Sequence, residues 1–118
     1  MNIQDLKLKL RSFAEEREWD QFHSPKNLAM ALGGEAGELL EHFQWLTEDQ
    51  SRRLTTDQTR MAKVSEEVAD IAIYIVRLCD KLDIDLESAI ENKIRANAAK
   101  YPVNLAKGNA TKYTEFGR

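Results

Sequence analysis

The amino-acid sequence predicts an all-α protein, a four-helix bundle protomer followed by an extended C-terminal arm. Two observations lead to this prediction. Apolar residues recur every three or four positions through most of the chain, as they do on one face of a helix. The 118 residues include only five glycines and two prolines, so the tight turns that a sandwich or barrel of short strands requires are scarce.

The first two helices are indicated by their start signals as well as by their period. We expect the first to follow Asn2, a capping residue, and to end near Trp19. Its apolar residues are Ile3, Leu6, Leu10 and Phe13. The second opens with the capping residue Ser24 and with Pro25, which is favoured at a first helical position, and it ends near Leu46. Its predicted core stripe is Leu28, Leu32, Ala36, Leu39 and Phe43.

The third and fourth helices follow a polar stretch. Thr55 and Gln58 have the spacing of a capping box, so we expect the third helix to begin there. Its predicted core stripe is Met61, Val64, Val68, Ile71, Ile75, Leu78 and Leu82. The fourth helix follows Asp85 as cap and stops before Pro102. Residues 102–118 have no sustained period and are expected to form an extended arm, ordered against another subunit.

Length and composition set the class of protein. A chain of 118 residues suits one domain, residues 1–118. The net charge of −3 gives no basic surface for a nucleic-acid polymer. No apolar run is long enough to span a membrane, and no signal peptide is visible. The single cysteine, Cys79, fits a reducing compartment, so we expect a cytoplasmic protein.

Two acidic pairs are the main functional signal. Glu35 and Glu38 lie three residues apart in the second helix, and Glu67 and Asp70 have the same spacing in the third. Residues three apart share one helical face. Each of these acids directly precedes a predicted core position, so both pairs should flank the inner seam of their helices. If the two helices pack antiparallel, the pairs face each other.

Converging carboxylates repel one another and stay ionised only when cations neutralise them. Oxygen ligands select hard ions, so Mg²⁺ or Mn²⁺ is the expected occupant. Gly33, Gly34 and Gly37 lie in the same helix at a cost of about 1 kcal/mol each relative to alanine, which suggests close approach by a helix or a phosphate. A di-iron bundle would need Glu-x-x-His on two helices, and that pattern is missing. The alternative is a solvated acidic face without metal.

Groups suited to a nucleotide surround these acids in the sequence. Trp19, Phe22, Trp45 and Tyr74 offer flat surfaces for a base. Lys93 and Asn97 lie four residues apart in the fourth helix and can meet phosphates or sugar. Ordinary core packing and a solvated helix face remain the alternatives for these residues.

Three motifs together resemble the MazG-like family of all-α nucleoside triphosphate pyrophosphohydrolases, over nearly the whole chain. They run from Arg17 to His23, from Gly34 to Trp45, and from Glu66 to Tyr74. The segments Lys100 to Val103 and Lys112 to Glu115 are similar to those of the dCTP-hydrolysing members. Close members carry a base-contacting histidine on the first helix where this chain has Leu10, so the base preference is left open.

The resemblance implies Mg²⁺ ligation by Glu35, Glu38, Glu67 and Asp70. It implies that Trp19 and Trp45 contact the base and that Tyr74, Lys93 and Asn97 lie near sugar and phosphates; His23, from the same motifs, is a further substrate-binding candidate. The implied reaction converts a dNTP and water to a dNMP and pyrophosphate, in a homodimer or homotetramer. Glu38 and Glu41 are the candidate general bases.

Two alternative functions stay open. One is a non-catalytic helical interaction module. The other keeps the fold but acts on dUTP, phosphoribosyl-ATP or a damaged nucleotide.

Overall fold

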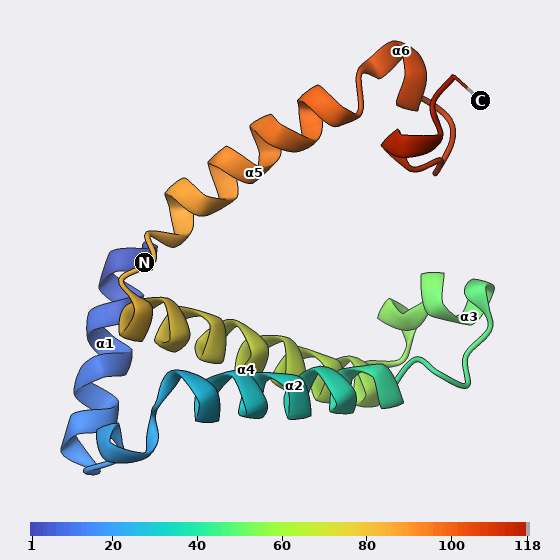
Figure 1. Ribbon diagram of the computed structural model, residues 1–118. Helices are drawn as coiled ribbons and strands as arrows, with labels where there is room; N and C mark the ends of the chain where they lie inside the picture. The colour runs from blue at the N-terminus through green and yellow to red at the C-terminus, as the bar shows by residue number, and fades with distance from the viewer. Residues whose placement is uncertain (118) are drawn as a thin grey trace. The chain divides into compact units, whose positions relative to one another are not determined.

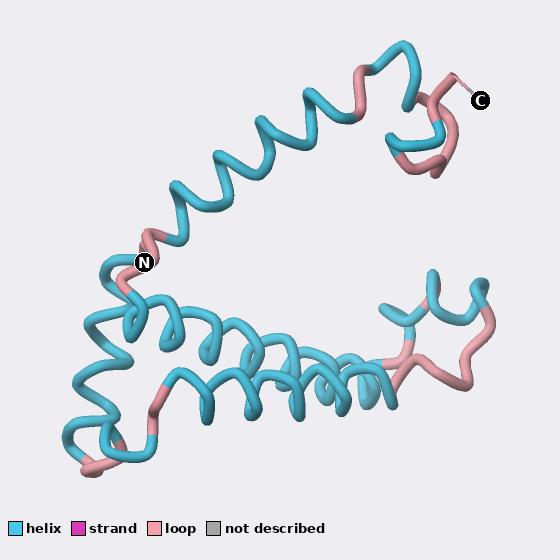
Figure 2. Tube along the Cα trace, in the orientation of Figure 1, coloured by secondary structure: helices cyan, strands magenta, loops and turns pink. Residues whose placement is uncertain are grey.

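The computed structural model describes residues 1–117, and every regular element in that range is helical (Figures 1 and 2). The order along the chain is α1 (Ile3–Glu16), η1 (Asp20–Phe22), α2 (Pro25–Glu41), α3 (Glu48–Arg52), η2 (Leu54–Thr56), α4 (Gln58–Leu82), α5 (Leu86–Lys100), α6 (Val103–Ala106) and η3 (Tyr113–Glu115). The chain divides into two compact units, Met1–Ile84 and Asp85–Arg118. Each unit is described by itself below.

The first unit is built on a helical hairpin. Helices α2 and α4 run antiparallel and side by side, and the segment containing α3 and η2 connects them (Figure 1). Helix α1 packs against α4, where Arg11 forms an ion pair of 2.6 Å with Asp80. The apolar side chains buried in the described residues are Ala14, Leu28, Leu54, Val64 and Val76. The antiparallel pairing expected for the second and third predicted helices is therefore present as α2 and α4.

Helix starts follow the predicted caps at three positions. The side chains of Asn2, Ser24 and Asp85 each accept a hydrogen bond from a backbone N–H three residues later, at the starts of α1, α2 and α5. Such bonds satisfy N–H groups that have no partner within the helix. Helix α2 ends at Glu41, earlier than the predicted end near Leu46, because the chain turns through residues 42–46.

The predicted capping box at Thr55 and Gln58 is wrong. Thr55 lies inside η2, and the cap of α4 is Asp57, whose carboxylate accepts a hydrogen bond from the Arg60 backbone N–H at 3.1 Å. A capping box does occur at Thr47 and Gln50, where it starts the short helix α3 in the stretch expected to be a polar connector. Thr47/Gln50 and Thr55/Gln58 have the same residue types at the same spacing. The local backbone conformation decides that only the first pair forms a capping box.

The interface between α2 and α4 differs from the predicted stripes at its centre. Ala36 is exposed and Val68 is 51% exposed, although both were predicted as core. Glu35 and Glu67 are half-buried in their place. A helical stripe advances by three or four residues at each step, so the sequence permits a stripe through Ala36 and Val68 or one through Glu35 and Glu67. Packing against the facing helix selects the second.

In the second unit, α5 is followed by a segment that is not continuously extended. Residues 102–117 contain α6 and η3, and the chain folds back so that the Tyr101 ring meets Tyr113 at 5.9 Å and Phe116 at 5.7 Å, both edge to face. Aromatic pairs in this geometry attract one another beyond simple burial. The expectation of an extended arm is corrected here, because turns this short have no hydrophobic period to detect.

Candidate metal centre

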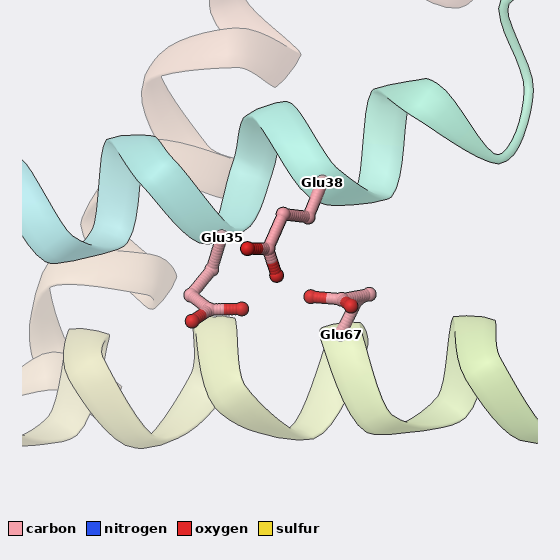
Figure 3. A group of neighbouring side chains, drawn as sticks. All are labelled: Glu35, Glu38 and Glu67. Carbon is pink, nitrogen blue, oxygen red and sulfur yellow. The ribbon is translucent and has the colours of Figure 1, made fainter.

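Three carboxylates converge between α2 and α4. Glu35 and Glu38 project from α2 and Glu67 projects from α4 toward them (Figure 3). One oxygen from each lies within 4.8 Å of the others. The three-residue spacing of Glu35 and Glu38 puts both on the face of α2 that is directed toward α4. The antiparallel hairpin then brings Glu67 to the same level.

Burial makes this convergence electrostatically unfavourable for ionised groups. The Oε2 atoms of Glu35 and Glu67 are buried and have no hydrogen-bond partner. Interaction with the Glu67 carboxyl, followed by burial and the nearby Glu38, raises the pKa of Glu35 to about 7. For Glu67, hydrogen bonding to Glu35 lowers the pKa, but burial and Glu38 raise it more, so its pKa is raised overall.

These donors fit a hard divalent cation. Buried carboxylate oxygens without a partner are costly, and a cation would satisfy them and relieve the repulsion at once. Mg²⁺ and Mn²⁺ prefer oxygen ligands. The residues that would hold such an ion are Glu35, Glu38 and Glu67.

Asp70 and Glu41 lie apart from the converging group. Asp70 is exposed on α4, one helical turn after Glu67, and its negative charge contributes to the raised pKa values of Glu35 and Glu67. Glu41 is exposed and lines a surface hollow of about 280 Å³ together with His42 and Lys63. Of these two residues, Asp70 is therefore the one with an electrostatic connection to the carboxylates.

His42 is a neighbour of the site that lies outside the predicted set of site residues. Its Nε2 lies 3.9 Å from Glu67 Oε1, and its backbone carbonyl accepts a hydrogen bond from Arg60. The sequence signal for this contact is that His42 follows Glu38 by four residues, which puts both on one helical face. The spacing alone does not predict the contact, because the partner Glu67 lies on another helix, α4.

The candidate substrate-binding residues are distributed over both units. Trp19 and His23 flank η1, with Trp19 packed edge to face on Phe13 at 5.8 Å and 6.5 Å from the His23 ring. Trp45 follows α2 and is 87% exposed, whereas Tyr74 is half-buried on α4. Leu10, the position that departs from the family pattern, is half-buried on α1. Lys93 and Asn97 are exposed on α5 in the second unit.

An antiparallel helical hairpin with inward carboxylates defines the class of protein, an all-α protein with a candidate metal site between two helices. The chain belongs to the MazG-like family, whose model matches residues 31–116. This match spans parts of both compact units.

Named relatives agree with this assignment. The chain is 40% identical to dCTP pyrophosphatase 1 of Mus musculus over 116 aligned residues. The alignment covers 98% of this chain and 68% of the mouse protein. Its identity to dCTP pyrophosphatase 1 of Homo sapiens is 40% over 114 residues, covering 97% of this chain and 67% of the human protein.

A solved structure is similar as well. The crystal structure of a pyrophosphatase from Archaeoglobus fulgidus matches with a TM-score of 0.77 and 39% identity, covering 84% of this chain and 91% of the other. The predictions of an all-α fold, of the MazG-like family and of a nucleoside triphosphate pyrophosphohydrolase are confirmed at this level. Among the helices of residues 1–117, none combines the length and the apolar character needed to cross a membrane.

Proposed function

We propose that this protein hydrolyses dCTP or a modified pyrimidine dNTP to the monophosphate and pyrophosphate, with Mg²⁺ as cofactor. The observation that carries the proposal is the convergence of Glu35, Glu38 and Glu67 with two buried oxygens that lack partners. The relatives named dCTP pyrophosphatase support the choice of substrate. Mn²⁺ is an alternative ion with the same ligand preference.

The reaction consumes one water. A water oxygen bonds to the α-phosphorus, the bond from that phosphorus to the bridging oxygen breaks, and pyrophosphate leaves with the electron pair. Glu35, Glu38 and Glu67 would hold a divalent cation, which would offset part of the triphosphate charge and lower the pKa of the attacking water. The chain's own residues position the reactants and accept the proton. Glu38 is the preferred base because it belongs to the converging group, and Glu41 is the second candidate.

The remaining assignments concern substrate contacts. Trp19 offers an aromatic face for the base, in contact with Phe13 and His23. Trp45, Tyr74, Lys93 and Asn97 stay predicted substrate contacts, and Asp70 stays a predicted fourth ligand. We also propose a cytoplasmic location, where the free Cys79 stays reduced.

The direct test is product analysis with a panel of canonical and 5-modified dNTPs, dUTP included, in the presence of Mg²⁺. We expect dCMP and pyrophosphate, and in ¹⁸O-labelled water we expect the label in dCMP. Orthophosphate together with dCDP would contradict the proposed bond cleavage. A preference for dUTP or a damaged nucleotide would support the same chemistry on another substrate.

Matched variants separate an enzyme from an interaction module. Glu67→Gln should lower kcat by about 100-fold or more, because it removes one charge from the converging group. Glu66→Gln is the control, since Glu66 is the exposed neighbour of Glu67 on α4. Equal activity in the two variants would remove the metal-site assignment. A wild-type protein inactive on the whole panel, and not stabilised by Mg²⁺ with a non-hydrolysable nucleotide, would favour the interaction module.

We further propose that the protein is a homodimer or homotetramer. The first unit leaves large apolar side chains exposed on both hairpin helices, including Met30 and Leu40 on α2 and Val68 on α4. A Cβ added at Gly33, Gly34 or Gly37 would meet no atom within 4 Å, so nothing within the described chain approaches these glycines closely. A second copy of the hairpin is the occupant we favour, because two hairpins complete a four-helix bundle.

The oligomer is tested by charge insertion into this face. Leu40 is 62% exposed, so Leu40→Glu should cost an isolated protomer little but should dissociate an assembly that buries it. Leu8→Glu on α1 is the matched control. Light scattering after gel filtration should show the variant as a monomer and the control as the wild-type assembly. A monomeric wild type would contradict the proposal.

A further inference from the structure

A buried arginine joins α4 to the turn between α1 and α2. The Arg77 side chain is 3% exposed and donates to Asp20 Oδ1 at 3.1 Å and to Asp80 Oδ2 at 3.3 Å. Its Nε and Nη2 atoms also lie 3.4 and 3.2 Å, respectively, from Nδ1 of His23. Asp20 and His23 belong to the turn around η1 that also holds Trp19. Arg77 thus links α4 to two side chains of that turn.

The turn that Arg77 contacts begins with a strained backbone conformation. It is entered through Glu18, whose φ of 56° lies in the left-handed region that non-glycine residues rarely adopt. Strained backbone of this kind persists when surrounding contacts fix it. The two carboxylates bound by Arg77 have second partners, since Arg11 binds Asp80 and Lys81 binds Asp20. Within residues 1–117, Arg77 is the side chain that hydrogen-bonds the His23 ring.

The contact fixes the protonation of the imidazole. A guanidinium carries only donors, so Nδ1 of His23 must accept and cannot bear a proton. An imidazole that accepts at Nδ1 in this way is neutral and carries its hydrogen on Nε2. Burial, and then the positive charges of Arg77 and Lys81, lower the pKa of His23 against the opposing effect of Asp20. Because Nδ1 is committed to Arg77, Nε2–H is the group left for another partner.

We propose that Arg77 is a positioning residue that holds His23 in the Nε2–H form, as a neutral hydrogen-bond donor beside Trp19 for an acceptor on the substrate's pyrimidine base. Pyrimidine bases carry such acceptors as carbonyl oxygens and, in cytosine, an unprotonated ring nitrogen. A fixed neutral donor selects for an acceptor without adding charge to the base site. The role at the base rests on the proposed function, whereas the tautomer follows from the contacts of this chain alone.

The tautomer is read directly by long-range ¹H–¹⁵N correlation spectra of the full-length protein. The chain has only two histidines, so a His42→Asn variant assigns both rings. We expect His23 to show Nε2–H and to titrate below the ordinary histidine value of about 6.5. Arg77→Met should give a tautomer mixture and raise the pKa of His23. Arg11→Met, which removes another arginine of the same network, should leave the His23 signals unchanged.

Steady-state kinetics test the role at the base. Arg77→Met and His23→Ala should each raise KM for dCTP by about 10-fold with kcat changed less than about threefold, because neither residue belongs to the carboxylate group where the reaction is proposed to occur. The double variant should be no worse than His23→Ala, because Arg77 acts through His23. Circular dichroism of each variant checks that the helices are retained.

Each outcome decides part of the proposal. A wild-type His23 carrying its proton on Nδ1 overturns the tautomer assignment, whether or not Arg77→Met folds. Independent KM effects that multiply in the double variant overturn the action through His23. If the wild type hydrolyses no pyrimidine dNTP, the proposed function and the base-donor role fail together, while the spectra still decide the tautomer.

Discussion

Binding of Mg²⁺ to the converging carboxylates should release a proton, in an amount that depends on pH. The pKa of Glu35 is raised to about 7 in the metal-free protein, so the group of three acids holds a proton near neutrality. A cation binds the deprotonated form and displaces that proton. With a pKa of about 7, Glu35 should release about 0.9 proton at pH 6, about 0.5 at pH 7 and about 0.1 at pH 8, and Glu67, whose pKa is also raised, should add to this release.

The same group makes the metal-free protein less stable as pH rises. Between about pH 4.5 and 7, the folded state binds more protons at Glu35 than the unfolded state does, so the free energy of unfolding falls through this window. Mg²⁺ at about 100 times its Kd should add about 2.7 kcal/mol, or about 10 °C in Tm for a chain of this size. Chelation of the metal should reverse the gain.

Isothermal titration calorimetry measures the proton release. Mg²⁺ is titrated at pH 6, 7 and 8 in pairs of buffers that differ in ionisation enthalpy, and the difference in apparent enthalpy gives the proton number. Glu35→Gln should weaken binding and reduce the pH dependence of proton release, whereas Glu66→Gln should leave both as in the wild type. The reasoning is refuted if release is the same at pH 6 and pH 8, or if the two variants behave alike.

Two further predictions concern stability of the first unit. Hydrogen bonding from Arg11 is the largest cause that lowers the pKa of Asp80, so its stabilising effect is present above about pH 4 and is lost as pH falls through the folded-state value. The stability gap between wild type and Asp80→Asn in urea should therefore be larger at pH 7 than at pH 3, and an equal gap would contradict this. Leu28 is 1% exposed, so Leu28→Ala should lower the free energy of unfolding by about 3 kcal/mol in urea titrations; a loss below about 1 kcal/mol would show that the site collapses without a cavity.

The sequence predicts the helix caps correctly where the interaction involves only neighbouring residues. Asn2, Ser24 and Asp85 cap their helices through side chains that reach only three residues along the chain. At the start of α4 two such signals compete, and Asp57 caps the helix instead of Thr55 because the η2 turn takes Thr55 out of the capping conformation. The choice between equivalent local signals depends on the path of the connector.

At the candidate site, the spacing of the residues predicted one part of the arrangement and the packing of α2 against α4 decided the rest. The three-residue spacing of the acids indicated that each pair shares a helical face. It did not show that Glu35 and Glu67 replace Ala36 and Val68 at the centre of the interface, since steps of three and four are equally helical. The glycines of α2 were expected to admit a close neighbour, and no atom of the described chain lies against them.

By itself, the sequence determined the helical class, the caps of α1, α2 and α5, the facial grouping of the acids and, through its motifs, the family. These depend on residue type and on spacing within a single helix. Only the tertiary structure decided that Glu67 lies against Glu35 and Glu38, that His42 lies beside Glu67, and that Arg77 reaches His23. Such contacts join residues far apart in the chain, and their distances follow from how two helices are rotated and set against each other, which no single helix encodes.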